Sequence, residues 1–389
     1  MEFNVVYFAT VGRNFGGVEQ KILAQYDELS KLKPNAVLYL VCSNAPQDTF
    51  AKEISTRPGV KILANSSTNT KNPFYRRKEK FQLISKALKN HDPENTIIYF
   101  RFPNSDFEML KFLKENRKFR FVTEHQEKEA NLREHNVAKY ILENFYGRRV
   151  RKRLSAIVGV TPEITKFQVE ESGQQDKRNI TLGNGIHVQK YQVRKLNPAH
   201  PEIVKILFVG SGYRCHGIDR IMKGIANYIH SGENKYKVVV RIAGESSTMN
   251  ANRVLAKKLK VEENVRFIGH KNVEELNEHY NWADIAMGSL AFHRIGLTFV
   301  SNLKAREYFT RGIPFFTSAI DEDLSGSPEY VMKVDADDLP INITDIVNFA
   351  LRIRSDTCHP CKMREYASAN LDWSIKIKKL VKFFETLFD

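Results

Sequence analysis

The apolar positions of this chain form short continuous runs that alternate with stretches of helical periodicity. Between Val18 and Leu29, for example, apolar residues recur every three or four positions, which is the spacing of one helix face. In the first half, the short apolar runs predict strands at 4–9, 37–42, 60–63, 97–103, 119–126, 157–160 and 180–186. This alternation of strands and helices predicts a parallel sheet that carries helices on both faces.

The pattern is interrupted at 187–201, a segment of little periodicity that is typical of a linker. Strands are then predicted at 203–209, 237–244, 265–268, 284–287, 314–317 and 330–333. The fold class that follows is α/β, with two doubly wound Rossmann-like domains, which we place at 1–190 and 191–362. Residues 363–389 carry one or two further helices and form a C-terminal tail.

Glycines mark a turn between a predicted strand and a predicted helix in each domain. In the second domain these are Gly210, Gly212 and Gly217. Such a turn directs backbone N–H groups and a helix N-terminus at the strand end, where a phosphate can bind. In the first domain, Gly16 and Gly17 would let a ligand approach the backbone closely. A purely structural tight turn is the alternative interpretation of both.

Lys304, Arg306 and Glu307 open a helical segment that ends at Gly312-Ile-Pro314. Two cations and one carboxylate suit a nucleotide, because the diphosphate needs positive charge and the ribose hydroxyls need an acceptor. A solvated helix face is the alternative. The nucleotide interpretation is favoured by the Gly-rich turn earlier in the same domain and by the regular order of strands between the two features.

Polar side chains also follow strands of the first domain. Arg101 ends one predicted strand, and Glu124 and His125 end the next. Ligands of parallel sheets lie at the carboxyl ends of the strands. The adjacent Glu-His pair is therefore a candidate for substrate contact or acid–base chemistry, with ordinary surface positions as the alternative.

The chain carries a formal net charge of +15 over 389 residues, which indicates an anionic partner. Basic residues cluster at 76–80, 148–153 and 376–382, partly beside aromatic residues, as at the surface of an anionic bilayer. Nucleic acid is a competing partner, but the sequence has no RNP-type aromatic motif and no zinc-finger pattern. No apolar run reaches the length of a membrane span, and the acidic start at Glu2 predicts no signal peptide.

Four cysteines do not form a disulfide framework. Cys358-His-Pro-Cys361 has the spacing of a redox or metal motif, but no second ligand pair has a matching spacing. Because the motif follows a predicted helix end rather than a strand, we expect a loop there. Asp321-Glu-Asp323 has the spacing of a metal-binding acidic motif, but it lies beyond the 304–312 helix, so we also expect a loop there.

Taken together, these motifs resemble the GT-B glycosyltransferases, most closely the retaining family-4-type enzymes of bacterial surface polysaccharide synthesis. The matching segments lie in order along nearly the whole chain: Gly16–Glu19, Asn184–Ile186, Val209-Gly210, His216–Asp219, Ile242–Gly244, Val265–Gly269, Ala283–Ile285, Glu307–Pro314 and Leu371–Trp373. The resemblance implies two domains facing a cleft, with the acceptor on the N-terminal domain, the nucleotide-sugar on the C-terminal domain, and the tail packing back toward the N-terminal domain.

The resemblance also implies roles for individual residues. Glu307 would hold the ribose, and Lys304 and Arg306 would lie near the diphosphate or the sugar. On the acceptor side, His125 would lie near the reacting centre. The remaining donor-side candidates are Gly210, Gly212, Arg214, His216, Gly217, Gly244, His293 and Arg294, and the remaining candidates on the acceptor side are Gly16, Gly17, Arg101 and Glu124.

The chain departs from the family pattern in two places. Ser211 and His216 stand where the family carries Arg and Lys in the phosphate loop, and Arg214 could replace the lost charge. Phe299 stands where the first of two family glutamates is expected, which leaves the donor sugar open. Some related polysaccharide transferases have an HRxG loop and a KxRE helix instead, a variant that is matched by His293, Arg294, Lys304 and Glu307.

The activity that the resemblance implies is transfer of a sugar from a nucleotide-diphosphate sugar, UDP-linked, to a glycan or lipid-linked acceptor. Retention of configuration, independence of metal, the absence of a cofactor, and a cytoplasmic location on the inner face of the plasma membrane are further expectations. The alternatives are a non-catalytic GT-B partner protein, a GT-B nucleotide-sugar epimerase and, on charge alone, a nucleic-acid-binding protein.

Overall fold

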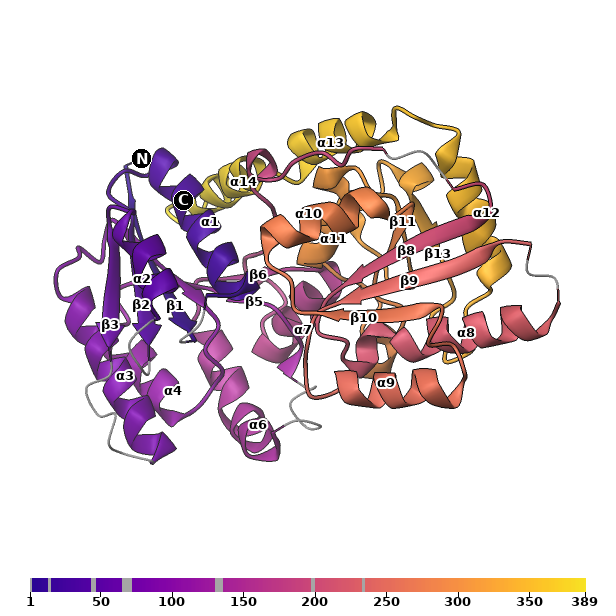
Figure 1. The fold of residues 1–389 in the computed structure, drawn as a ribbon. Helices are drawn as coiled ribbons and strands as arrows, with labels where there is room; N and C mark the ends of the chain where they lie inside the picture. Colours follow the sequence, from indigo (N-terminus) through magenta and orange to yellow (C-terminus); the bar gives the residue numbers. More distant parts are fainter. Residues whose placement is uncertain are drawn as a thin grey trace. The chain divides into compact units, whose positions relative to one another are not determined.

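The computed structural model describes residues 2–12, 15–42, 47–64, 72–129, 136–196, 200–232 and 235–389 (Figure 1). The chain forms two compact units. Unit 1 contains residues 1–183 and 373–389, and unit 2 contains residues 184–372. The boundaries that we expected from the sequence lie at 190 and 362.

Unit 1 is built on a seven-stranded sheet in which all strand pairs are parallel, in the order β3-β2-β1-β4-β5-β6-β7. The central strand β1 pairs Val6 with Val37 on one side and Val5 with Ile97 on the other. The strands are β1 (Asn4–Val11), β2 (Val37–Cys42), β3 (Val60–Ala64), β4 (Thr96–Arg101), β5 (Arg120–His125), β6 (Ala156–Gly159) and β7 (Asn179–Thr181).

Helices cover both faces of this sheet, because successive residues of a strand point to opposite sides. Val5 and Tyr7 pack in one core with α1, α2 and α14, whereas Val6 and Phe8 pack in another with α3, α4 and α6. The helices are α1 (Gly17–Leu32), α2 (Asp48–Ser55), α3 (Pro73–Leu88), α4 (Phe107–Glu115), α6 (Val137–Lys152), α7 (Pro162–Ser172) and α14 (Trp373–Glu385).

Unit 2 is built on a six-stranded parallel sheet in the order β10-β9-β8-β11-β12-β13. Its strands are β8 (Ile203–Val209), β9 (Lys237–Ala243), β10 (Val265–Gly269), β11 (Ile285–Met287), β12 (Phe315–Thr317) and β13 (Val331–Lys333). Its α-helices are α8 (Ile218–His230), α9 (Met249–Lys258), α10 (Val273–Trp282), α11 (Leu303–Arg311), α12 (Ile343–Arg354) and α13 (His359–Asn370). The predicted fold class, two doubly wound α/β domains, is confirmed.

Each sheet reverses its winding beside its first strand. In unit 2, β8 lies between β9 and β11, so the chain leaves β8 toward one side of the sheet and returns on the other. The loops that follow β8 and β11 therefore diverge, and a crevice forms at the carboxyl ends of the strands. This is the position in unit 2 where a ligand is expected.

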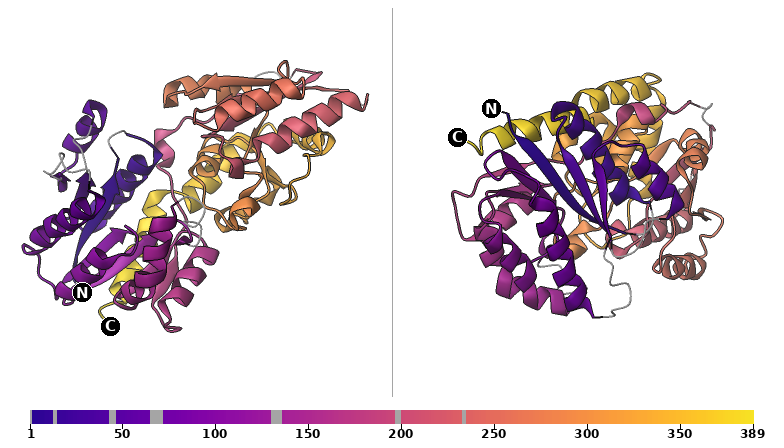
Figure 2. Two further views of the ribbon diagram at one scale, coloured as in Figure 1. Left: turned by 90° about the horizontal axis from the view of Figure 1, so that it is seen from below. Right: turned by 90° about the vertical axis from the view of Figure 1, so that its left-hand side faces the viewer.

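The predicted tail is two helices that belong to different units. The helix α13 is the last element of unit 2, and α14 is part of unit 1. Trp373, Ile377, Leu380 and Phe384 of α14 are buried in the core that contains β1 and α1. Figure 2 shows α14, in yellow, running beside the strands and helices of unit 1 in both views.

The expectation of a loop at Cys358–Cys361 is wrong. After α12 ends at Arg354, only a short turn precedes α13, whose N-cap is Cys358. Pro360 lies in the first turn of α13, where its missing N–H and fixed φ favour helix initiation. The cysteines therefore open a helix.

Candidate functional site

The loop after β8 and the loop after β9 meet backbone to backbone at the crevice of unit 2. A Cβ atom placed on Gly244 would lie 2.0 Å from the carbonyl oxygen of Gly210, and Gly244 has a φ of +136°, so only glycine fits there. The Thr248 hydroxyl donates a hydrogen bond to the Gly212 carbonyl at 3.1 Å. The structure thus brings together the predicted glycines of the two loops.

The β8 loop ends in a short 3-10 helix, Arg214–His216, and α8 begins one residue later, after Gly217. Arg294 holds this segment in place. Its guanidinium donates to the Arg214 carbonyl at 2.9 Å and forms a two-point ion pair with Asp219, at 2.8 and 2.9 Å. Arg294 also pairs with Asp338, as does the neighbouring His293 at 3.4 Å. Arg294 therefore supports the loop, whereas the Arg214 side chain is exposed.

Lys304 lies in the first turn of α11 with its ammonium group turned inward. Its Nζ lies 4.3 Å from the centre of the Phe208 ring and is buried without a hydrogen-bond partner among the described residues. Burial lowers the pKa of Lys304 to about 7. A buried ammonium group without a counter-ion is costly. An anion bound beside Lys304 would offset this cost.

His216 lies close to the same place, because its ring centre is 5.4 Å from that of Phe208. Burial, and to a lesser degree the Lys304 cation, lower the pKa of His216 to about 2. The imidazole is therefore neutral. Its Nδ1 is buried and finds no partner within the part of the chain that the structure describes.

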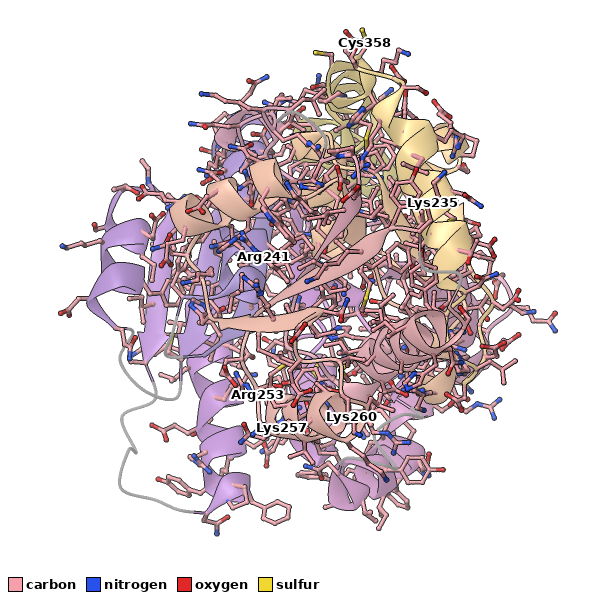
Figure 3. The ribbon with its side chains drawn as sticks, turned by 45° about the vertical axis from the view of Figure 1, so that its right-hand side comes forward. Lys235, Arg241, Arg253, Lys257, Lys260 and Cys358 are labelled. Carbon is pink, nitrogen blue, oxygen red and sulfur yellow. The ribbon has the colours of Figure 1, made fainter. Side chains whose placement is uncertain are left out.

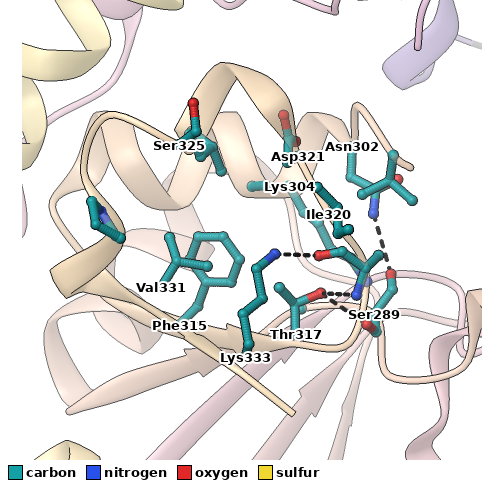
Figure 4. Close-up of a pocket in the computed structure, with 16 residues that line it drawn as sticks. Ser289, Asn302, Lys304, Phe315, Thr317, Ile320, Asp321, Ser325, Val331 and Lys333 are labelled. Carbon is teal, nitrogen blue, oxygen red and sulfur yellow. Dashed lines mark hydrogen bonds between the residues drawn. The ribbon is translucent and has the colours of Figure 1, made fainter. Parts of the chain in front are cut away.

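A cavity of about 140 Å³ adjoins Lys304 at the carboxyl ends of β11, β12 and β13 (Figure 4). Ser289 and Thr317 line it and are hydrogen-bonded to each other, with Thr317 Oγ1 donating to the Ser289 carbonyl at 2.9 Å. Lys333 reaches across it to the Ala319 carbonyl at 2.6 Å. Because pockets for whole ligands measure about 300–1,000 Å³, this cavity has room for only part of one.

Glu307 lies one turn after Lys304 on α11, and its side chain is 18% exposed. Its Oε1 accepts a hydrogen bond from Nε of Arg311 at 2.8 Å. Arg311 is itself buried and donates to Asn277. Glu307 is thus held in a fixed orientation, and its side chain remains partly exposed.

Arg306 points into the interior of unit 2. Its side chain has no exposed surface and forms ion pairs with Asp321 and Asp323. Its Nε donates to the Asn184 carbonyl at 2.8 Å. The two aspartates of the Asp-Glu-Asp segment therefore neutralise a buried cation. We expected a loop for this segment, and the structure has a short 3-10 helix at Glu322–Leu324.

In unit 1, Glu124 and His125 lie on opposite faces of the sheet. Glu124 is 1% exposed; its Oε1 accepts a hydrogen bond from Gln25 at 2.8 Å and forms an ion pair with Lys21 at 3.1 Å, both on α1. Burial lowers the pKa of Lys21 to about 8. The sequence analysis did not identify Lys21 as a candidate residue, although this lysine interrupts the apolar face of the predicted helix. Arg101, at the end of the neighbouring strand, also attracts the Glu124 carboxylate.

His125 belongs to a second buried network. Its Nε2 is 2.9 Å from the Thr123 hydroxyl, and its Nδ1 is 3.3 Å from Glu129. Arg151 pairs with Glu129 at 2.9 Å and also with Glu143. Burial lowers the pKa of His125, whose side chain has no exposed surface. The structure therefore does not bring Glu124 and His125 together as one acid–base pair.

The glycine turn of unit 1 is closed by one carboxylate. Glu19, in the first turn of α1, accepts hydrogen bonds from the backbone N–H groups of Gly12 and Gly16, both at 3.1 Å. The helix begins at Gly17, directly after this turn. The turn holds the N-terminus of α1 at the carboxyl end of β1.

Comparisons with known proteins agree with this architecture. Residues 203–353 match the family described as Glycosyl transferases group 1. No curated protein matches the chain by sequence. Among solved structures, a glycosyltransferase from Rickettsia africae ESF-5 is similar over 100% of this chain and 99% of its own, with 14% identity and a TM-score of 0.69.

Two further structures share the fold. WaaG, described as a glycosyltransferase involved in lipopolysaccharide biosynthesis, is similar over 96% of this chain and 98% of its own, with 15% identity and a TM-score of 0.65. A variant of S. aureus TarM in complex with fondaparinux, alpha-GlcNAc-glycerol and UDP is similar over 99% of each chain, with 10% identity and a TM-score of 0.61. Residues 203–353 thus form a glycosyl transferases group 1 domain, and the chain is a glycosyltransferase of the GT-B fold.

Proposed function

We propose that the enzyme transfers a sugar from a UDP-linked donor to a glycan or lipid-linked acceptor in cell-surface polysaccharide synthesis. The observation that carries this proposal is the buried, unpartnered ammonium group of Lys304 beside the loop Gly210–Gly217. A diphosphate would supply the missing negative charge. The presence of UDP in the TarM structure supports the choice of base.

Lys304 and the loop would also serve the chemistry. As the bond to the sugar breaks, negative charge builds up on the leaving diphosphate. A fixed cation and the backbone N–H groups at the start of α8 can stabilise that charge without reorganising. Because these groups can do so by themselves, we propose a metal-independent reaction without a cofactor. Retention of configuration rests on the resemblance to retaining enzymes.

The donor site can be tested by thermal unfolding with UDP, GDP and ADP. A ligand at about 100 times its dissociation constant stabilises the folded state by about 2.7 kcal/mol. We expect such a shift with UDP and its loss in Lys304→Met. Lys257→Met, at an exposed lysine of α9 in the same unit, is the matched control. A UDP shift that survives in Lys304→Met would refute the proposed diphosphate contact.

We further propose that unit 1 docks on an anionic membrane surface at the inner face of the plasma membrane. In the described part of the chain, no helix has the length and apolarity to cross a bilayer. The support comes from the exposed face of α6. Val137, Ile141 and Phe145 follow one another at four-residue spacing and are 60%, 60% and 59% exposed.

Cations continue the same face of α6. Arg149 and the C-cap residue Arg153 extend the four-residue spacing toward the C-terminus of the helix, and the Arg149 guanidinium lies 4.7 Å from the Phe145 ring. At the N-terminus of α4, which packs against α6, Phe107 is also 57% exposed. Exposed apolar side chains flanked by cations are typical of helices that lie on anionic membranes. A lipid-linked acceptor would be reached from such a surface.

Sedimentation with vesicles tests this docking. We expect binding to vesicles that contain phosphatidylglycerol and weaker binding to phosphatidylcholine alone. Ile141→Asp should weaken the binding, whereas Val254→Asp, at a 66% exposed position of α9, should not. Equal binding of the wild type to both kinds of vesicle would refute the proposal.

Separately, turnover of UDP-GlcNAc without any acceptor would favour the epimerase alternative.

A further inference from the structure

Cys358 and Cys361 occupy the first turn of α13, away from the donor site. Cys358 is the N-cap and Cys361 lies three residues further on. Both thiols are free and exposed, unlike Cys42, which is buried, and Cys215, which is half-buried. Figure 3 shows Cys358 at the outer surface of the molecule. The pair is therefore accessible to small reagents.

The two residues between the cysteines face the other way. His359 is 2% exposed, and Pro360 is buried. A Cβ atom placed on Gly312, at the end of α11, would lie 2.3 Å from Cα of Pro360, so the turn is packed directly on the end of that helix. The interior residues hold the turn in place while both thiols point outward.

The geometry of the turn suits a disulfide. The Cys361 N–H donates to the Cys358 carbonyl at 3.1 Å, which closes the turn. Residues three apart on a helix have Cβ atoms about 5–6 Å apart. A disulfide needs about 3.5–4.5 Å, and a small adjustment of the N-cap residue can supply the difference.

A metal site is a weaker interpretation of the pair. Within the described ranges, no cluster of three or more His, Cys, Asp or Glu side chains could hold a metal ion. Structural zinc normally takes four ligands, two more than this turn offers. Two exposed thiols at this spacing are suited instead to bond formation with each other.

We infer that Cys358 and Cys361 form a reversible dithiol–disulfide couple that restrains the first turn of α13. The oxidant is a low-molecular-weight disulfide. One cysteine thiolate attacks it, forming a mixed disulfide and releasing one thiol. The second cysteine then attacks the sulfur of the first and releases the second thiol. The protein loses two protons and two electrons, and the small disulfide is reduced to two thiols.

The test equilibrates the full chain in buffers of varied ratio of reduced to oxidised glutathione. Free thiols are then blocked with an alkylating reagent and the peptides are analysed by mass spectrometry. We expect a 358–361 peptide that has lost two hydrogens in oxidising buffer and regains them in reducing buffer. Cys42 should remain a free thiol throughout, as the internal control.

Single substitutions separate the couple from simple surface oxidation. In Cys361→Ser, the mixed disulfide between glutathione and Cys358 should accumulate, because the resolving thiol is missing. In the wild type it should not accumulate. Stable glutathione adducts on the wild-type cysteines, or two thiols that stay reduced throughout, would overturn the inference. Because the readout is chemical, it does not depend on the proposed donor or acceptor.

Discussion

The buried Arg306 gives the sharpest test of how unit 2 is held together. Its guanidinium has no exposed surface and is shared between Asp321, Asp323 and the Asn184 carbonyl. The substitution Arg306→Met keeps the apolar stem and removes the charge. Asp321 and Asp323 would then lose the buried cation with which both form ion pairs.

The expected cost follows from that burial. Removing one partner of a buried ion pair costs about 3–5 kcal/mol, because the remaining charge is left uncompensated. For a domain of about 150–250 residues, each kcal/mol lowers Tm by roughly 2–4 °C. Unit 2 comprises residues 184–372, so we expect Tm of this unit to fall by roughly 6–20 °C.

The assay is thermal and urea unfolding of Arg306→Met, with UDP affinity measured at a temperature where the variant is folded. In an Asp321→Asn/Asp323→Asn background, the same substitution should cost much less, because the uncompensated charges are gone. A variant with nearly unchanged stability and strongly reduced UDP affinity would refute the argument. Arg306 would then act on the donor, the role that the family resemblance implies.

Three further predictions concern the other candidate residues. Burial lowers the pKa of Lys304 to about 7, and a bound diphosphate should raise it. UDP binding should therefore take up a proton above pH 7 and should weaken as the pH rises. Calorimetry in two buffers can measure this proton uptake, and the uptake should be absent in Lys304→Met. His125→Ala should lower the unfolding free energy of unit 1 by about 1–3 kcal/mol, since buried partners lose their hydrogen bonds, and should leave the UDP shift unchanged. Gly244→Ala should abolish the UDP shift, because its methyl group would strike the Gly210 carbonyl, with circular dichroism as the check on folding.

Periodicity was sufficient to predict the fold. The short apolar runs marked the strands of both sheets, and the glycines after β8 marked the loop at the switch point. The start of α3 carries a local signal of the same kind: Pro73 opens the helix, and the Asn72 side chain accepts a hydrogen bond from the Phe74 N–H at 2.9 Å. These features are local, so the sequence contains them.

The partners of buried charges were not predictable in the same way. The rest of α11, the strand β12 and a turn separate Arg306 from Asp321 and Asp323, so no local spacing connects the guanidinium with the two carboxylates. For Glu124 and His125, by contrast, the signal was present. Adjacent residues of a strand point to opposite faces, so a shared site was improbable once the strand had been assigned.

The discontinuity of unit 1 has a consequence for synthesis of the chain on the ribosome. Unit 2 is continuous in sequence, whereas the core of unit 1 includes Trp373 and Phe384 from α14. The unit that is translated first is therefore completed last. Until α14 has left the exit tunnel, the apolar side of β1 and α1 lacks its cover, and nascent unit 1 would be the part of the chain that needs a chaperone.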